Sequence, residues 1–170
     1  MTTFVALLRA VNVGGTGKLP MTELKAICES VGFSQVRTYI ASGNVVFDSD
    51  LTESKVKAAL EETLQAYAGK PVGVMVRTGP QLAQVLADNP FAEGPGNRVV
   101  AIFLDESPPE DALEQAVNQA DDEKTALGGR EIYVWYGAGM ADTKLRIPAA
   151  KSGTARNMNT VAKLAQMAGA

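Results

Sequence analysis

The side chains in this chain that could bind a ligand are mainly cations near its two ends. The first group is Arg9, Asn12, Gly14, Gly15 and Lys18, which follow an apolar run and precede a candidate helix. Backbone N–H groups of such a loop can face an anion, and the lysine adds positive charge. The alternative is a strand-to-helix connection whose glycines only satisfy backbone geometry.

This loop does not match the two common nucleotide-binding motifs. A P-loop needs glycine five positions before its final glycine, and Ser or Thr after the lysine. Those positions hold Asn12 and Leu19. The G-x-G-x-x-G motif of dinucleotide-binding proteins also fails, because Pro20 stands at its third glycine. We therefore expect neither ATP nor NAD to bind in these ways, and we expect no cofactor.

A second cationic segment lies at the other end of the chain. The apolar spacing predicts a terminal helix from about residue 154 to 168, with Thr154 as its N-cap. Its first turn holds Arg156 and Asn157 but no acid, and Lys163 follows on its polar stripe. A helix start without an acid favours a bound anion, because the helix dipole is positive there. The alternative is an ordinary solvated helix face.

Charge is unevenly distributed along the chain. The formal net charge is −3, but no acid follows Asp142, and the five cations after it are joined by two in the acid-free first 22 residues. The middle of the chain therefore carries −10. Such segregation can draw an anion toward one side of a protein. The acidic balance argues against nucleic-acid coating by bulk charge, although a local basic patch would be compatible with it.

Histidine and cysteine usage excludes several chemistries. The chain has no histidine and one cysteine, Cys28. Ser-His-Asp and Cys-His catalysis and ordinary zinc sites are therefore excluded, and no intramolecular disulfide can form. Cys28 falls on an apolar helix face and is predicted to be a core residue. The acidic run at residues 121–123 is interpreted as a solvated turn, so no metal site is predicted.

The N-terminal segment has no basic region ahead of its apolar stretch. Arg9 interrupts that stretch, no small-residue cleavage site follows, and nowhere do eighteen apolar residues run together. Export and membrane spanning are not expected. Because the cysteine content also suits a reducing compartment, we expect a cytoplasmic protein.

The first half of the chain shows the element order that would position these residues. Residues 3–9 are predicted as a strand, and a helix follows Pro20. Two predicted strands, 36–41 and 45–48, flank the short turn Ser42-Gly43-Asn44 and are predicted to form a hairpin. A helix at about 52–67 and a strand at 71–77 complete the order β-α-β-β-α-β of a ferredoxin-like unit.

The order β-α-β-β-α then recurs about ninety residues further on. The second set comprises a strand at 99–104, a helix beginning near Ser107, a hairpin of 124–127 with 131–136, an extended piece at 144–147 and the terminal helix. The sequence predicts an α+β fold of two duplicated ferredoxin-like (βαββαβ-type) halves, with antiparallel or mixed sheets and helices on one face. The predicted halves are residues 1–90 and 97–170, with a linker at about 92–97. The alternative is one mixed sheet without internal symmetry.

Four ordered motifs resemble a known bacterial family. They are Leu7–Gly15 leading into Lys18–Met21, then Arg37–Phe47, Asn89–Phe91 and Thr154–Leu164. In this combination the chain is similar to the family called domain of unknown function 1697. The resemblance implies two ferredoxin-like halves and no known activity. It also implies Trp at position 158, where this chain has Met.

The polar motif residues form one candidate site. They are Arg9, Asn12, Lys18, Arg37, Ser42, Asn44, Arg156, Asn157 and Lys163, joined by Gly14 and Gly15. We hypothesise that some of them converge at one cleft and bind a small anionic ligand such as a phosphate-bearing molecule. The alternatives are a histidine-independent enzyme with a carboxylate base and a nucleic-acid or protein interaction module. The sequence does not specify the oligomeric state.

Overall fold

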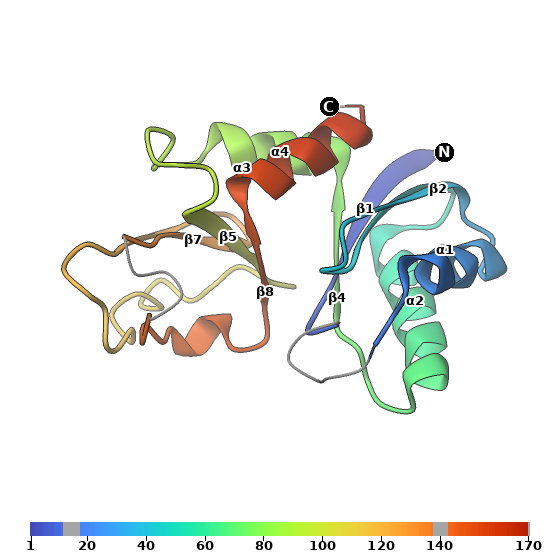
Figure 1. Cartoon of the computed structure of the whole chain (residues 1–170), viewed down its shortest axis with the longest axis horizontal. Helices are drawn as coiled ribbons and strands as arrows, with labels where there is room; N and C mark the ends of the chain where they lie inside the picture. Colours follow the sequence, from blue (N-terminus) through green and yellow to red (C-terminus); the bar gives the residue numbers. More distant parts are fainter. Residues whose placement is uncertain (12–17, 138–142, 170) are drawn as a thin grey trace. The chain divides into compact units, whose positions relative to one another are not determined.

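The computed structural model of the chain describes residues 1–11, 18–137 and 143–169 (Figure 1). Asn12, Gly14 and Gly15 of the predicted site therefore lie outside the described residues. The described chain divides into two compact units. The first consists of residues 1–82 and 164–170, and the second of residues 83–163.

The first unit contains a four-stranded antiparallel sheet among its described residues. Its strands are β1 (Thr2–Leu8), β2 (Ser34–Tyr39), β3 (Asn44–Ser49) and β4 (Val74–Thr78), in the order β2-β3-β1-β4. Helices α1 (Met21–Ser30) and α2 (Glu53–Ala68) lie against one face of this sheet (Figure 1). This is the strand order of a ferredoxin-like unit.

The core of this unit follows from the alternation of side chains along β1. Phe4, Ala6 and Leu8 point to the helix-covered face and join the core cluster there. Val5 and Leu7, on the other face, are also fully buried. A strand that is buried on both faces reads as a continuous apolar run, which is the pattern that the sequence shows here.

The second unit repeats the strand order. Its strands are β5 (Val99–Phe103), β6 (Lys124–Leu127), β7 (Glu131–Trp135) and β8 (Thr154–Asn157), in the order β6-β7-β5-β8 and all antiparallel. Helix α3 (Gly79–Ala87) directly follows β4, and α4 (Met158–Met167) directly follows β8. The predicted α+β class of two ferredoxin-like halves is confirmed by the sheets and helices of the described residues.

One predicted helix of the second half is wrong. The segment after Ser107 forms turns, in which Ala112 N donates to Pro109 O and Glu114 N donates to Asp111 O. Acids at Glu110 and Glu114 repel each other at helical i, i+4 spacing, which disfavours a helix here. The covering layer of this sheet is instead built from turns and the short 3-10 helix η2 (Pro148–Ala150).

The predicted start of the terminal helix is also wrong. Residues 154–157 form strand β8, in which Thr154 pairs with Phe103 and Arg156 with Ala101. Helix α4 therefore begins at Met158 and is capped by Asn157, whose Oδ1 accepts a hydrogen bond from Thr160 N at 2.9 Å. Pairing with a distant strand overrode the helical periodicity that continues from α4 into this segment.

The predicted boundaries of the two halves stay a prediction, and the compact units divide differently. The division between the units falls inside α3 and inside α4. Within the second unit, the turn at the predicted linker packs closely: a Cβ placed on Gly94 would lie 2.9 Å from Trp135 Cε2. Residues of the expected linker thus have specific packing of their own.

Candidate functional site

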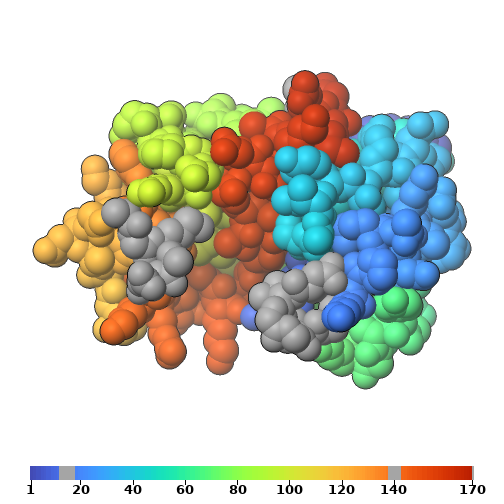
Figure 2. Space-filling view, in the orientation of Figure 1, coloured from blue at the N-terminus to red at the C-terminus, as the bar shows by residue number. Residues whose placement is uncertain are grey.

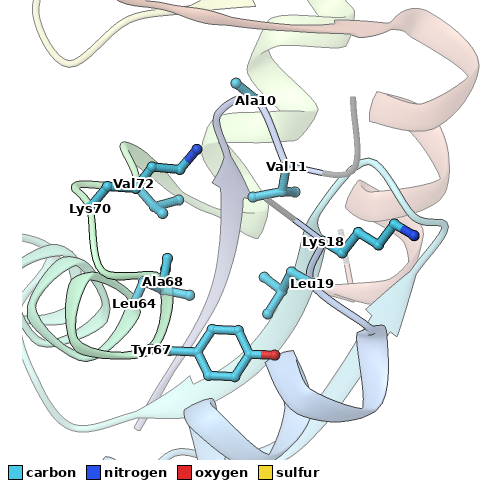
Figure 3. Close-up of a pocket in the computed structure, with 9 residues that line it drawn as sticks. All are labelled: Ala10, Val11, Lys18, Leu19, Leu64, Tyr67, Ala68, Lys70 and Val72. Carbon is cyan, nitrogen blue, oxygen red and sulfur yellow. The ribbon is translucent and has the colours of Figure 1, made fainter. Parts of the chain in front are cut away.

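A cavity of about 300 Å³ opens in the first unit, beside the C-terminal end of α2 (Figure 3). Three short segments contribute its walls: the chain after β1, the approach to α1, and the end of α2 with the residues that follow it. The lining residues are Ala10, Val11, Lys18, Leu19, Leu64, Tyr67, Ala68, Lys70 and Val72. In Figure 2 the blue surface around α1 and the green surface after α2 lie side by side.

The first wall is positioned by the end of β1. Leu8 N donates to Gly43 O at 2.8 Å, and Arg9 N donates to Gly73 O at 2.9 Å. The chain is thus held on both sides before it turns at Ala10, whose φ is +56°. A left-handed φ is uncommon for a residue with a Cβ and costs energy, so this turn is imposed by its surroundings.

The second wall is the last turn of α2. Leu64 continues the buried stripe of Val56 and Leu60 and is 1% exposed, so it forms the cavity floor. Tyr67, three residues later at the edge of the stripe, is 47% exposed. Gly69 ends the helix in the left-handed conformation with φ +74°, which turns the chain toward Lys70 and Val72.

The electrostatic character of the cavity comes from its lysines. Lys18 and Lys70 lie on opposite sides of the hollow, and Val11, Leu19 and Val72 lie between them (Figure 3). None of the nine described lining residues carries a carboxylate. The C-terminal end of α2 is slightly negative, so an anionic group would be placed at the lysines rather than at the helix end.

The hairpin residues of the predicted site have structural contacts. Asn44 is fully buried, and its Nδ2 donates to Tyr39 O and to Ser42 Oγ, both at 2.9 Å. Gly43 has a φ of +89°, and a Cβ there would lie 2.6 Å from Val11 Cγ2. The closed hairpin therefore packs behind one wall of the cavity. Arg37 is exposed on β2.

Of the predicted cations in the first unit, Lys18 lines the cavity and Arg9 does not. Arg9 is exposed one residue before the cavity wall, and its Cβ and Cδ lie over Gly73. Among the residues that the structure describes, the cavity thus contains one member of the predicted site, Lys18, together with residues that the sequence did not single out.

In the second unit Arg156 is buried rather than exposed on a helix. It is 6% exposed, and its Nη1 donates to Thr154 Oγ1 at 2.6 Å and to Ala155 O at 2.9 Å. Burial lowers the pKa of Arg156 to about 10, which leaves it charged at neutral pH. Asn157 caps α4, and Lys163 is exposed on that helix. Convergence of these residues with those of the first unit stays a prediction.

Sequence reasoning missed Lys70, Tyr67 and Arg77. Lys70 follows the helix-ending Gly69, and no motif marks it. Arg77 could have been found by comparing the two halves, because Arg77-Thr78 precedes α3 as Arg156-Asn157 precedes α4. Arg77 is 1% exposed, and its Nη1 donates to Val76 O at 2.9 Å. Thr78 Oγ1 then accepts from Gln81 N at 3.3 Å, much as Asn157 caps α4.

Two other candidate groups, the Cys28 thiol and the Glu123 carboxylate, are buried and have structural roles. Burial, and secondarily Glu29, raises the pKa of the Cys28 thiol to about 12. Glu123 is 6% exposed and accepts hydrogen bonds from Ala120 N at 2.7 Å and from Thr143 Oγ1. Within the residues that the structure describes, no group of three or more carboxylate or cysteine side chains is arranged to hold a metal.

None of the described helices is long and apolar enough to cross a membrane.

Fold and cavity together define a small α+β protein with two ferredoxin-like sheets and a lysine-rimmed hollow. The chain belongs to the family described as protein of unknown function (DUF1697), whose model matches residues 1–133. It is similar in structure to the conserved bacterial protein SP0830 from Streptococcus pneumoniae, with a TM-score of 0.80 and 23% identity over 98% of each chain. That likeness shows the fold. No curated protein matches the sequence.

Proposed function

We propose that this protein binds a small anionic ligand in the cavity between Lys18 and Lys70. The observation that carries the proposal is the composition of the wall: two lysines and no carboxylate among nine described residues around a hollow of about 300 Å³. A volume of this size is at the lower end of small-molecule sites. In a chain of net charge −3, a wall whose described residues include two cations and no acid provides a local field for an anion.

Binding is a better match to this wall than catalysis. The alternative of a histidine-independent enzyme with a carboxylate base needs that carboxylate near the substrate, and none of the described lining residues supplies one. The aliphatic side chains of the wall cannot transfer protons. We therefore propose a cytoplasmic binding protein for a small metabolite rather than an enzyme.

The proposal is tested by ligand-induced shifts in thermal melting. A panel of nucleotides, sugar phosphates, inorganic phosphate and short RNAs is screened with the full chain, and each hit is titrated by calorimetry. We expect saturable binding of a small anion with little salt dependence. We also expect Lys18→Gln with Lys70→Gln to weaken it by about tenfold or more, because each charge-assisted contact contributes roughly 1.5–3 kcal/mol.

Lys25→Gln is the matched control, because Lys25 is an exposed lysine of α1 that does not line the cavity. It should bind as the unaltered protein does. Equal loss in the control and the double variant would show a bulk charge effect. An unchanged affinity in the double variant, or binding of RNA alone with a steep salt dependence, would overturn the proposal.

A further inference from the structure

The side chains that line the cavity indicate more about the ligand than its negative charge. Six of the nine described lining residues are aliphatic: Ala10, Val11, Leu19, Leu64, Ala68 and Val72. An inorganic anion seated against them would lose hydration without gaining hydrogen bonds, which is costly. A ligand with an apolar body would instead remove this surface from water. The wall therefore favours an amphiphilic molecule.

The cations of the wall indicate the headgroup. The two cations among the described lining residues are lysines, which act as point charges on flexible stems. A planar carboxylate is matched best by the fork of an arginine. Two lysines offer two positive charges, and a phosphate monoester carries about −1.5 to −2 charges at neutral pH. A phosphate headgroup therefore matches both the number and the kind of the cations.

Tyr67 adds an aromatic surface to the same wall. Its ring stands at the edge of the hollow, opposite Val11, and the residue is 47% exposed (Figure 3). An exposed ring of this kind offers an apolar face for a ligand body, and its hydroxyl is a hydrogen-bond donor. The ring thus lies where an apolar body would extend from the lysines toward the end of α2.

We propose that the ligand is a phosphate monoester with a compact apolar or aromatic body. The body occupies the space between Val11, Leu19, Val72 and the ring of Tyr67, and the phosphate lies at the rim of the hollow. In Figure 3 the ammonium group of Lys18 points away from that of Lys70, so binding requires the flexible stems of both lysines to turn toward the phosphate from the two sides. The cavity volume of about 300 Å³ suits a body of one or two rings and not an oligonucleotide. This inference rests on the proposed function, because it names the ligand class of the same site.

Calorimetry with four probes tests the ligand class. The probes are phenyl phosphate, inorganic phosphate, benzoate and benzyl alcohol, each titrated into the full chain at one salt concentration. We expect phenyl phosphate to bind about tenfold or more tightly than inorganic phosphate, since burying one ring removes substantial apolar surface from water. Benzoate should bind more weakly than phenyl phosphate, and benzyl alcohol should bind weakest.

The outcomes separate this inference from the proposed function. If inorganic phosphate binds as tightly as phenyl phosphate, the inference that the ligand has an apolar body is overturned, and the proposed anion-binding function is kept. If benzoate binds as tightly as phenyl phosphate, the inference of a phosphate headgroup is overturned, and the proposed anion-binding function is again kept. If benzyl alcohol binds as well as the anions, or if no anion binds, both proposals are overturned.

Two variants then assign the contacts. Tyr67→Ala removes the ring at an exposed position and should weaken phenyl phosphate by about threefold or more, with little effect on inorganic phosphate. Lys70→Gln should weaken both phosphates by a similar factor, with Lys25→Gln again as the control. Circular dichroism melts of each variant check folding. A Tyr67→Ala protein that keeps the full preference for phenyl phosphate would contradict the placement of the body.

Discussion

Arg77 and Arg156 are both buried, and each donates an Nη1 hydrogen bond to the carbonyl of the preceding residue. Neither position is obvious from hydropathy, because buried arginine is rare. Each stands immediately before the residue that caps the following helix. This correspondence at two positions in each half supports the predicted duplication, and it places both arginines at strand-to-helix junctions, β4–α3 and β8–α4.

Burial also determines the chemistry of Cys28. The pKa of the thiol is raised to about 12 from an ordinary value of 9.0, so the folded protein holds the proton more tightly than the unfolded chain does. The resulting stabilisation is fully present below pH 9 and is lost as the pH rises from 9 toward 12. At neutral pH the side chain is a buried thiol and not a nucleophile.

We predict that stability falls faster between pH 8 and pH 10 in the unaltered protein than in Cys28→Ala. The difference should be about 1 kcal/mol at pH 10, since one pKa unit corresponds to about 1.4 kcal/mol. Urea denaturation at the two pH values measures it, and the alanine variant has no thiol to titrate. Parallel losses of stability in the two proteins would show that Cys28 does not titrate on unfolding.

At the scale of elements, two side chains of α2, Lys57 and Glu61, join this helix to β4 by hydrogen bonds to the backbone of Val74. We call this arrangement the clamp. Glu61 Oε2 accepts from Val74 N at 3.1 Å and from Lys57 Nζ at 2.9 Å. Lys57 Nζ also donates to Val74 O at 2.6 Å. The two side chains thus bond both the N–H and the C=O of Val74, the first residue of β4 after the cavity-lining residues Lys70 and Val72.

We predict that Glu61→Ala lowers the free energy of unfolding by about 1–2 kcal/mol, because it removes the acceptor for a backbone N–H in a partly buried site. Glu62→Ala is the matched control, since Glu62 is the next residue of α2 and is exposed. Its effect should stay within about 0.5 kcal/mol. Urea denaturation of both variants makes the comparison. Equal effects of the two substitutions would argue that the clamp contributes nothing beyond helix propensity.

At the scale of the whole molecule, the remaining prediction concerns the cations near both ends of the chain. The sequence-based hypothesis that one ligand uses both groups predicts that Lys163→Gln weakens anion binding about as much as Lys18→Gln. The proposed site in the first unit predicts instead that Lys163→Gln leaves the affinity unchanged. The measurement is calorimetric titration of the same anion into both variants. An affinity for Lys163→Gln equal to that of the unaltered protein would confine the binding site to the first unit.

The local patterns of the chain were sufficient for much of the fold. The continuous apolar run of β1, the Gly-Asn hairpin turn and the periodic stripe of α2 predicted those elements, because each pattern lies within a few neighbouring residues. The same reasoning correctly placed Cys28 in the core. Its two largest errors lie in segments where two conformations compete.

The errors are the helices predicted for residues 154–157 and for the acidic segment after Ser107. Both segments carry helical signals, but one pairs with β5 and the other forms turns that cover the second sheet. The pairing of residues 154–157 with β5 depends on a strand that is distant in the sequence, so neighbouring residues do not encode it.

By itself the sequence determined the fold class, the exclusion of histidine and zinc chemistry, and the cationic character of the two ends. Only the tertiary structure decided that Lys18 shares a cavity with Tyr67 and Lys70, and that Arg156 is buried in a strand. The physical reason is that composition and periodicity are local properties of the chain. A binding surface is made by segments that the sheet and helices bring together from distant positions.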